Sequence, residues 1–229
     1  MNFCLRRIAN RWNGKMHRKS IFSRAPFFAL VALLAFVSGC GSARPIKYYQ
    51  LSPPPATATA SAEPIDVRIL VRLPLSSHIY REDPIVYSGD AHQLGVYQEN
   101  RWAEPPAEML QSSIVRGLHA SGRFRAVQNQ RSDSNGEYLL VSQLYAFNEV
   151  TGPNLSARLS YDVDLRELKT GNVVWSHSYN HDEPSGGKTV TDIVVAMDKN
   201  IQRSVEEIQT GLDDYFKNHP PARETPAAQ

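Results

Sequence analysis

The chain has 229 residues and a formal net charge of +2, from 25 lysines and arginines against 23 aspartates and glutamates. Seven of the cations lie in the first 24 residues, where there is no acid, so the chain after residue 39 has 18 basic against 23 acidic residues. A mildly acidic chain without a basic cluster excludes the electrostatic footprint of a nucleic-acid-binding protein. The 190 residues after position 39 are enough for one domain of ordinary size.

The N-terminal segment has the order of a secretory signal. A basic stretch is followed by the apolar run 27–36 and by the small residues Val37-Ser38-Gly39, directly before Cys40. The alternative is a transmembrane helix ending at Cys40, but the run is shorter than the roughly 20 apolar residues that such a helix needs. Met16 would give a leader of more ordinary length than Met1, and the true start stays open between the two.

The run that ends at Cys40 resembles a bacterial lipobox. The resemblance implies that the signal peptide, residues 1–39, is cut after Gly39, and that Cys40 receives a diacylglycerol and an N-acyl chain such as palmitate. Apart from this covalent lipid, no cofactor is expected. The other cysteine of the chain is Cys4 in the leader, so the mature domain has no thiol pair for a disulfide and depends on a packed core.

Residues 40–64 are predicted to be a lipid anchor and flexible tether. Ser52 is followed by three prolines and an Ala/Thr/Ser run, a composition typical of an extended connection that cannot donate to a sheet. The folded domain is predicted over residues 65–216. The proline- and alanine-rich residues 217–229 are predicted to be a disordered tail.

Period-two alternation predicts the strands, and apolar stripes at three- and four-residue spacing predict the helices. The predicted strands are an edge strand at 48–51 and then 65–73, 85–87, 94–97, 124–127, 138–150, 155–165 and 173–179, and the predicted helices are 105–119 and 189–216. Residues 138–150 are apolar on both faces, which predicts a central strand. Short turns between consecutive strands predict antiparallel pairing. The predicted fold is an α+β two-layer sandwich of a largely antiparallel sheet, a mid-chain helix and a long C-terminal helix, whose stripe could cover the sheet or reach a partner.

The sequence lacks the motifs of common enzymes. Gly186-Gly187-Lys188-Thr189 resembles the end of a phosphate loop, but Asp182 stands where that motif needs its first glycine, and a carboxylate there would repel phosphate. The G-x-S-x-G and H-E-x-x-H signatures are also missing from the chain. These absences favour a protein that is not an enzyme.

Two pairs of titratable residues could form sites. His177 and His181 lie four residues apart on a predicted strand, about 13 Å at a rise of roughly 3.3 Å per residue, and could share a metal only if that strand breaks. Exposed strand-end histidines are the simpler interpretation, and no metal is predicted. Asp162 and Asp164 share a strand face with two arginines, which favours a solvated surface over an acid–base pair.

The segment Trp102-Ala103-Glu104-Pro105 is the most distinctive stretch after the lipobox. Glu104 suits the N-terminal end of the helix that follows, and Trp102 could pin that helix to the core. Together with the lipobox, Tyr48–Leu51, Ile85–Tyr87 and Ala196-Met197, this segment resembles the ABC-type transport auxiliary lipoprotein family over nearly the whole mature chain. Pro106 departs from the resemblance, since a bulky apolar residue is expected there.

The resemblance implies a non-enzymatic component of an intermembrane lipid transport system, similar to paraquat-inducible and Mce-type assemblies. Its implied partners are an Mce-type protein, an ABC permease system and, through the lipid, a membrane. Gly41 rather than Asp follows the cysteine, which by the usual sorting rule implies the periplasmic face of the outer membrane. The transported lipid, its direction and any homo-oligomer stay open.

Exposed aromatic residues are the expected contacts of a docking surface. The candidates for partner docking are Tyr87, Tyr97, Trp102 and Glu104, with Tyr80 as a further aromatic; each could instead serve packing. The rival hypothesis is a structural lipoprotein of envelope assembly that is not tied to a transporter. A third, an enzyme, would need a polar cluster in a cleft.

Overall fold

The computed structural model describes residues 44–51, 64–90 and 92–221. The predicted signal peptide, the cleavage site at Gly39 and Cys40, and most of the tether and tail lie outside the described residues. The elements within them are β1 (Lys47–Tyr49), β2 (Ile65–Val71), β3 (Leu75–Ser76), the 3-10 turn η1 (His78–Tyr80), β4 (Pro84–Asp90), β5 (Gln93–Trp102), α2 (Pro106–Ala120), β6 (Phe124–Asn129), β7 (Tyr138–Val150), β8 (Ser156–Glu167), β9 (Val173–Pro184) and α3 (Val190–Asn218).

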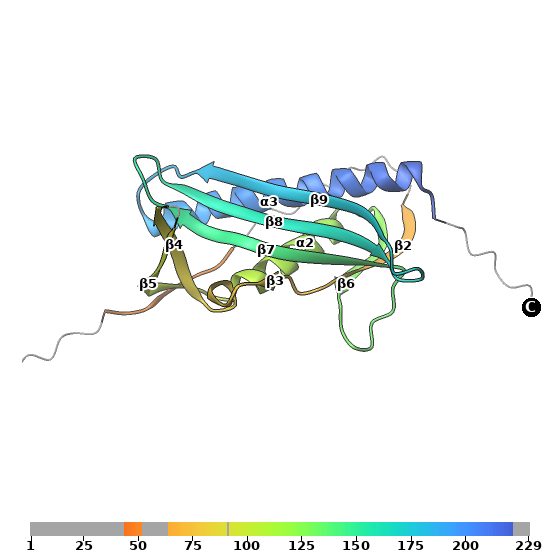
Figure 1. Cartoon of the computed structure of the whole chain (residues 1–229), viewed down its shortest axis with the longest axis horizontal. Coiled ribbons are helices and arrows are strands. Elements are labelled where there is room, and N and C mark those ends of the chain that lie inside the picture. The colour runs from red at the N-terminus through yellow and green to blue at the C-terminus, as the bar shows by residue number, and fades with distance from the viewer. Residues whose placement is uncertain (1–43, 52–63, 91, 222–229) are drawn as a thin grey trace, which may run out of the picture. The chain divides into compact units, whose positions relative to one another are not determined.

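β7 is the centre of the sheet, as its two apolar faces predict. One edge of β7 pairs antiparallel with β8 from Tyr138 opposite Glu167 to Val150 opposite Ser156. The other edge pairs in succession with β2, β3 and β4, all parallel to it. Residues 69–88 therefore run alongside β7 in one direction, from its start at Tyr138 to its end at Val150. Figure 1 shows β7 between β8 and the β2–β4 path.

The predicted α+β fold is confirmed, with a sheet of nine strands in the described part of the chain. The sheet is mixed. Its longest pairings, β7 with β8 and β8 with β9, are antiparallel, and so is the β4–β5 hairpin. The parallel pairing of β2 with β6 is possible because α2 lies between β5 and β6 and lets the chain return to run alongside β2 in the same direction.

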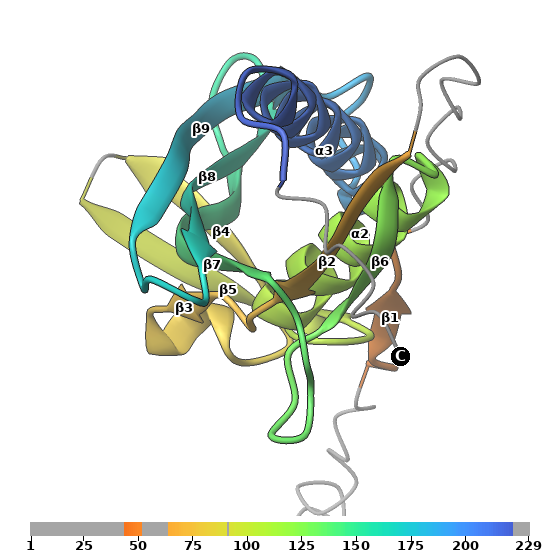
Figure 2. The same ribbon diagram turned by 90° about the vertical axis from the view of Figure 1, so that its right-hand side faces the viewer.

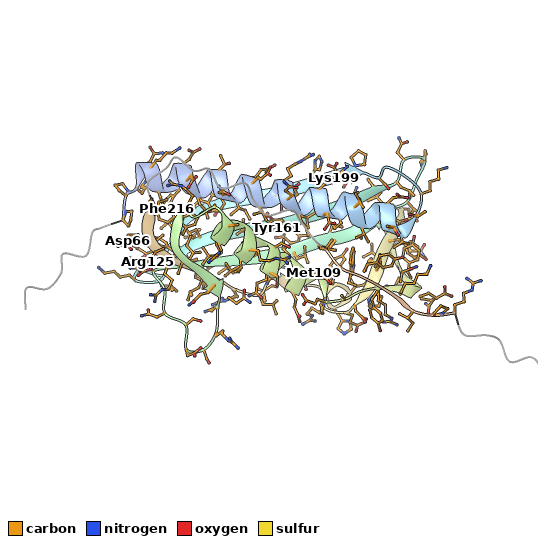
Figure 3. The ribbon with its side chains drawn as sticks, turned by 180° about the vertical axis from the view of Figure 1, so that it is seen from behind. Asp66, Met109, Arg125, Tyr161, Lys199 and Phe216 are labelled. Atoms are coloured by element: carbon orange, nitrogen blue, oxygen red, sulfur yellow. The ribbon has the colours of Figure 1, made fainter. Side chains whose placement is uncertain are left out.

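Both helices pack on one face of the sheet. α3 lies over β8 and β9, while α2 lies over β6 and beside α3. In the end-on view of Figure 2, the sheet curves around the two helices, and Figure 3 shows the helical side from behind. The inward side chains of β8 are all buried: Ala157, Leu159, Tyr161, Val163 and Leu165. The long stripe of α3 is thus core, because it covers the antiparallel half of the sheet.

The N-terminus of α3 is closed by a capping box. The Thr189 hydroxyl accepts from the Asp192 N–H at 3.2 Å, and the Asp192 carboxylate accepts from the Thr189 N–H at 2.9 Å. A carboxylate of the chain thus occupies the place that an anion would take at this end of the helix. The segment Gly186–Thr189 is therefore a loop and a helix cap.

A buried polar group fixes how α3 sits on the sheet. The fully buried Asn200 amide donates to the carbonyl of Ala157 on β8 at 2.8 Å and to that of His181 on β9 at 3.0 Å. Its side-chain oxygen accepts from the Tyr179 hydroxyl at 2.6 Å. Since an unpaired buried amide is costly, any rotation of α3 that breaks this set is disfavoured.

We expect Ile201→Ala to lower the free energy of unfolding by about 2–5 kcal/mol, because Ile201 is fully buried between α3 and the sheet. Chemical denaturation of the mature chain measures this loss. Val195→Ala, at an exposed position of the same helix, is the matched control and should stay within about 0.5 kcal/mol of wild type. Equal losses at both positions would contradict the assignment of the α3 stripe to the core.

Candidate functional site

Trp102 lies in the core at the end of β5. Its side chain is 1% exposed and packs edge-to-face on Phe147 of β7, with ring centroids 5.5 Å apart. Two hydrogen bonds hold the backbone at this position. The Trp102 N–H donates to the Asp83 carbonyl, and the Ala103 N–H donates to the Tyr49 carbonyl, each at 2.7 Å. Trp102 thus fixes the place where α2 begins.

α2 begins directly after this buried anchor. Pro105 has an extended backbone with ψ of 144°, and Pro106 occupies the first turn of the helix, where its missing N–H costs nothing. Pro106 is therefore compatible with the helix start. The departure from the family pattern at this position leaves α2 in place.

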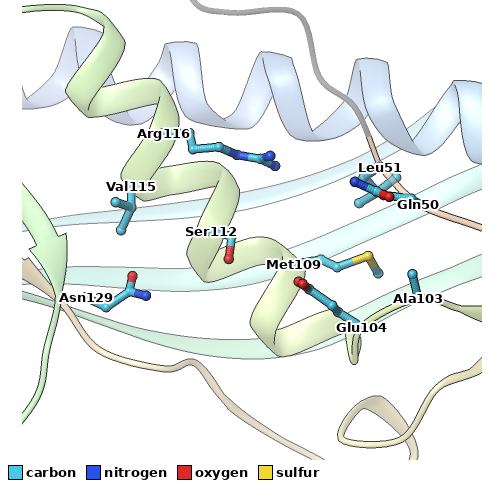
Figure 4. Close-up of a pocket in the computed structure, with 9 residues that line it drawn as sticks. All are labelled: Gln50, Leu51, Ala103, Glu104, Met109, Ser112, Val115, Arg116 and Asn129. Atoms are coloured by element: carbon cyan, nitrogen blue, oxygen red, sulfur yellow. The ribbon is translucent and has the colours of Figure 1, made fainter.

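A groove lies beside this junction, between the end of β1, the β5–α2 connection and α2 (Figure 4). It encloses about 420 Å³. The buried side chains of Leu51 and Met109 form an apolar floor, and the rim is polar, formed by Gln50, Glu104, Ser112, Arg116 and Asn129. We call this feature the α2 groove.

The α2 groove carries one charge of each sign. Glu104 and Arg116 are both exposed, and within the described residues neither forms an ion pair or a side-chain hydrogen bond. Figure 4 shows the Arg116 side chain extending over the groove toward Leu51. An apolar floor inside a polar rim is the usual build of a protein interface.

Tyr87 and Tyr97 form a second cluster on the β4–β5 hairpin. Their rings lie 5.1 Å apart, and the Tyr97 hydroxyl donates to Glu149 Oε2 of β7 at 2.9 Å. Gly95 makes room for this arrangement, because a Cβ at that position would overlap the Tyr87 ring. Both tyrosines are half-buried, so each presents only part of its surface to a partner.

Glu149 is a buried acid, 3% exposed. Burial raises the pKa of the Glu149 carboxyl, and the hydrogen bond from Tyr97 offsets part of this effect. The pKa of Tyr97 is also raised, first by burial and then by its hydrogen bond to Glu149. The cluster therefore favours a neutral pair over a charged one.

The structure separates the four docking candidates into three places. Tyr87 and Tyr97 lie together on the hairpin, Trp102 is in the core, and Glu104 is on the rim of the α2 groove. Tyr80 is buried and donates to Asn148 Oδ1 at 3.2 Å. Whether any of these residues contacts a partner stays a prediction.

Two residues of these clusters, Glu149 and Arg116, are not among the site residues predicted from the sequence. Glu149 is the one acid within the largely apolar strand Tyr138–Val150, a signal that could have marked it as a buried polar group. Arg116 follows Ser112 by four residues on α2, so a helical projection places the two on one polar face. Tyr97, which donates to Glu149, and Glu104, which lines the same groove as Arg116, come from other elements that sequence spacing does not connect to them.

The histidine and aspartate pairs do not converge. His177 Nε2 lies 3.0 Å from Glu207, whereas His181 Nε2 lies 2.6 Å from Arg203. Among the residues that the structure describes, no group of three His, Cys, Asp or Glu side chains could hold a metal ion. Asp162 instead accepts from the Tyr145 hydroxyl at 2.7 Å on the outer face of the sheet.

The family model of the ABC-type transport auxiliary lipoprotein component matches residues 49–209. The chain belongs to this family. The matched range runs from the end of β1 to the last turns of α3, so it includes the α2 groove, Trp102 and the Tyr97–Glu149 pair. Within the described residues, no helix is both long and apolar enough to span a membrane. No curated protein matches the chain.

Solved structures share the fold at low identity. A DUF330 protein from Xanthomonas campestris is 20% identical with a TM-score of 0.67, covering 76% of this chain and 98% of its own. A second, uncharacterized protein is 15% identical with a TM-score of 0.60, covering 74% of this chain and 99% of its own. A PelC dodecamer from Paraburkholderia phytofirmans is 14% identical with a TM-score of 0.43, covering 66% and 93%, a likeness too low to carry an argument about assembly.

We expect Glu149→Gln to remove a pH-dependent part of the stability. The folded-state pKa of Glu149 is raised, so its contribution is present at acid pH and is lost as the pH rises through that folded-state pKa. The variant keeps an oxygen that accepts from Tyr97 but cannot ionise. Its free energy of unfolding, measured relative to that of wild type, should therefore rise from acid to neutral pH. Denaturant unfolding across this range measures the difference.

The control is Glu104→Gln, at an exposed carboxylate, which should stay within about 0.5 kcal/mol of wild type. A Glu149→Gln variant that loses stability relative to wild type as the pH rises would contradict the burial argument.

Proposed function

We propose that the mature protein is a non-enzymatic, lipid-anchored auxiliary component of an Mce-type intermembrane lipid transport system, held at the periplasmic face of the outer membrane. The observation that carries this proposal is the family match over residues 49–209, in a chain whose lipobox-like run ends at Cys40. The first described strand, β1, begins only seven residues after Cys40.

The lipid anchor follows from Cys40 and the residues around it. A signal with small residues before the cysteine supports cleavage after Gly39, and two acyl chains anchor stably where one gives marginal binding. Gly41 in place of an aspartate supports sorting to the outer membrane. We expect no bound group other than the acyl chains on Cys40.

The α2 groove is the surface that best suits a protein partner. Its charges are unpaired within the described residues and its floor is apolar, so a partner segment could pack on the floor formed by Leu51 and Met109 and pair with the charges of Glu104 and Arg116. The groove also includes Ala103 and Glu104 of the segment that is most typical of the family. We assign the Mce-type protein as its occupant.

Cys40→Ala should abolish incorporation of labelled palmitate, block processing and remove the protein from the outer-membrane fraction, because acylation and cleavage both depend on that thiol. Cys4→Ala is the matched control and should behave as wild type, since Cys4 lies in the leader. Normal processing and palmitate labelling of Cys40→Ala would refute the anchor.

Arg116→Glu should lower recovery of the Mce-type protein in detergent co-purification by about tenfold, the effect of losing one contact worth about 1.4 kcal/mol. Lys199→Glu, the same charge change at an exposed position of α3, should leave recovery unchanged. Recovery of an envelope scaffold in place of an Mce-type protein would support the rival structural role.

A further inference from the structure

Exposed apolar side chains lie along the β1–β5 ribbon, at the end of the domain where the chain enters it. Tyr48 on β1 is 64% exposed and Leu94 on β5 is 47% exposed, with Ile46 and Val96 also exposed. Within the described residues, the sheet ends at β1, which pairs with β5 alone. These side chains therefore lie on an open rim of the sheet.

The strand register places these side chains on one face. Tyr48 lies opposite Arg101, which lies opposite Pro84 of β4. Val96 and Leu94 lie opposite Val86 and Ser88, the next alternate residues of β4. Because alternate residues of a strand share a face, Tyr48, Val96 and Leu94 point to the same side. Ile46 precedes Tyr48 by two residues and follows the same alternation.

The direction of β1 decides where the lipid anchor leaves the domain. β1 runs parallel to β5, from Lys47 opposite Asn100 to Tyr49 opposite Trp102. Followed toward its N-terminus, the chain therefore runs toward the start of β5, where Leu94 lies. Arg44 also lies beside β5, since its side chain is 3.6 Å from Glu99.

The tether beyond Arg44 is short. Cys40 precedes Arg44 by four residues, which span at most about 14 Å when fully extended. An acylated Cys40 has its chains in the bilayer, so the β1–β5 rim cannot stand far from the lipid surface.

We propose that the face carrying Ile46, Tyr48, Leu94 and Val96, the membrane-proximal face, lies against the lipid bilayer. The proposal rests on the proposed function, through acylation of Cys40. The bilayer interface suits its chemistry, because apolar side chains and a tyrosine bury there favourably. The exposed cation Lys47 beside it favours anionic headgroups.

In this orientation, the end of the domain far from β4 and β5 extends into the aqueous space. β4 pairs with the end of β7 at Glu149, whereas the β8–β9 hairpin adjoins its start, with Glu167 opposite Tyr138. Twelve steps along β7 amount to about 40 Å at roughly 3.3 Å per residue. Figure 1 shows β4 and the β8–β9 hairpin at opposite ends of β7.

Single-cysteine labelling tests this orientation on the full lipidated protein. Cys4 is removed with the leader and the Cys40 thiol is consumed by the lipid, so one introduced cysteine is the single free thiol. Leu94→Cys probes the membrane-proximal face. Leu168→Cys beside the β8–β9 turn is the matched control, a leucine of similar exposure, 42% against 47%. Tyr48→Cys repeats the measurement on β1.

Each variant carries an environment-sensitive fluorophore and is reconstituted into vesicles of phosphatidylethanolamine and phosphatidylglycerol with spin-labelled quencher lipids. We expect blue-shifted emission and severalfold stronger quenching at positions 94 and 48 than at position 168. Equal quenching at all three positions, or none at 94 and 48, would overturn the orientation. Blue-shifted emission without lipid quenching would mean that protein, such as a second copy, covers this face, and would overturn it as well.

Palmitate incorporation, measured on the same samples, separates the two proposals. Protein that is acylated but not quenched at position 94 overturns the orientation and leaves the anchor standing. Protein that takes up no palmitate overturns both.

Discussion

The domain depends on β7 being paired along both of its edges. One continuous stretch, residues 69–88, pairs along one edge in parallel, and β8 of the β8–β9 meander pairs antiparallel along the other edge. A strand of 13 residues in this position cannot shift by one residue without moving every inward side chain to the wrong face. The register of β7 therefore fixes the positions of the β4–β5 hairpin and the β8–β9 turn together.

The two helices bury the inner face of the sheet, which the sheet alone would leave exposed to water. The apolar stripe of α3 covers the inner face of β8 and β9, and Asn200 adds directional hydrogen bonds to the carbonyls of Ala157 and His181. Hydrophobic burial supplies most of the stability but is indifferent to small rotations of the helix. The satisfied amide makes one rotation preferable, so the arrangement of α3 on the sheet is well specified.

The proposed surfaces lie on different parts of this frame. Trp102 anchors the start of α2 in the core, which places Glu104 and the α2 groove beside it on the surface. The β1–β5 rim lies next to the point where the tether leaves. A lipid-anchored auxiliary protein needs one face for the membrane and another for its partner. The sheet separates them because β1 is its edge strand within the described residues, while α2 lies over its inner face.

The sequence by itself determined the period of each element, the central place of residues 138–150 and the family, because apolar spacing and short motifs are local properties. It placed the start of α2 and the hairpin turn before β9 for the same reason. Only the tertiary structure decided that β2, β3 and β4 run parallel to β7, since that depends on a crossover through α2. It also decided that Trp102 is buried against Phe147, that Tyr97 meets Glu149, and that Glu104 and Arg116 share a groove. The members of these pairs are 12 to 52 positions apart in the chain, and sequence spacing carries no information about which distant side chains a fold brings together.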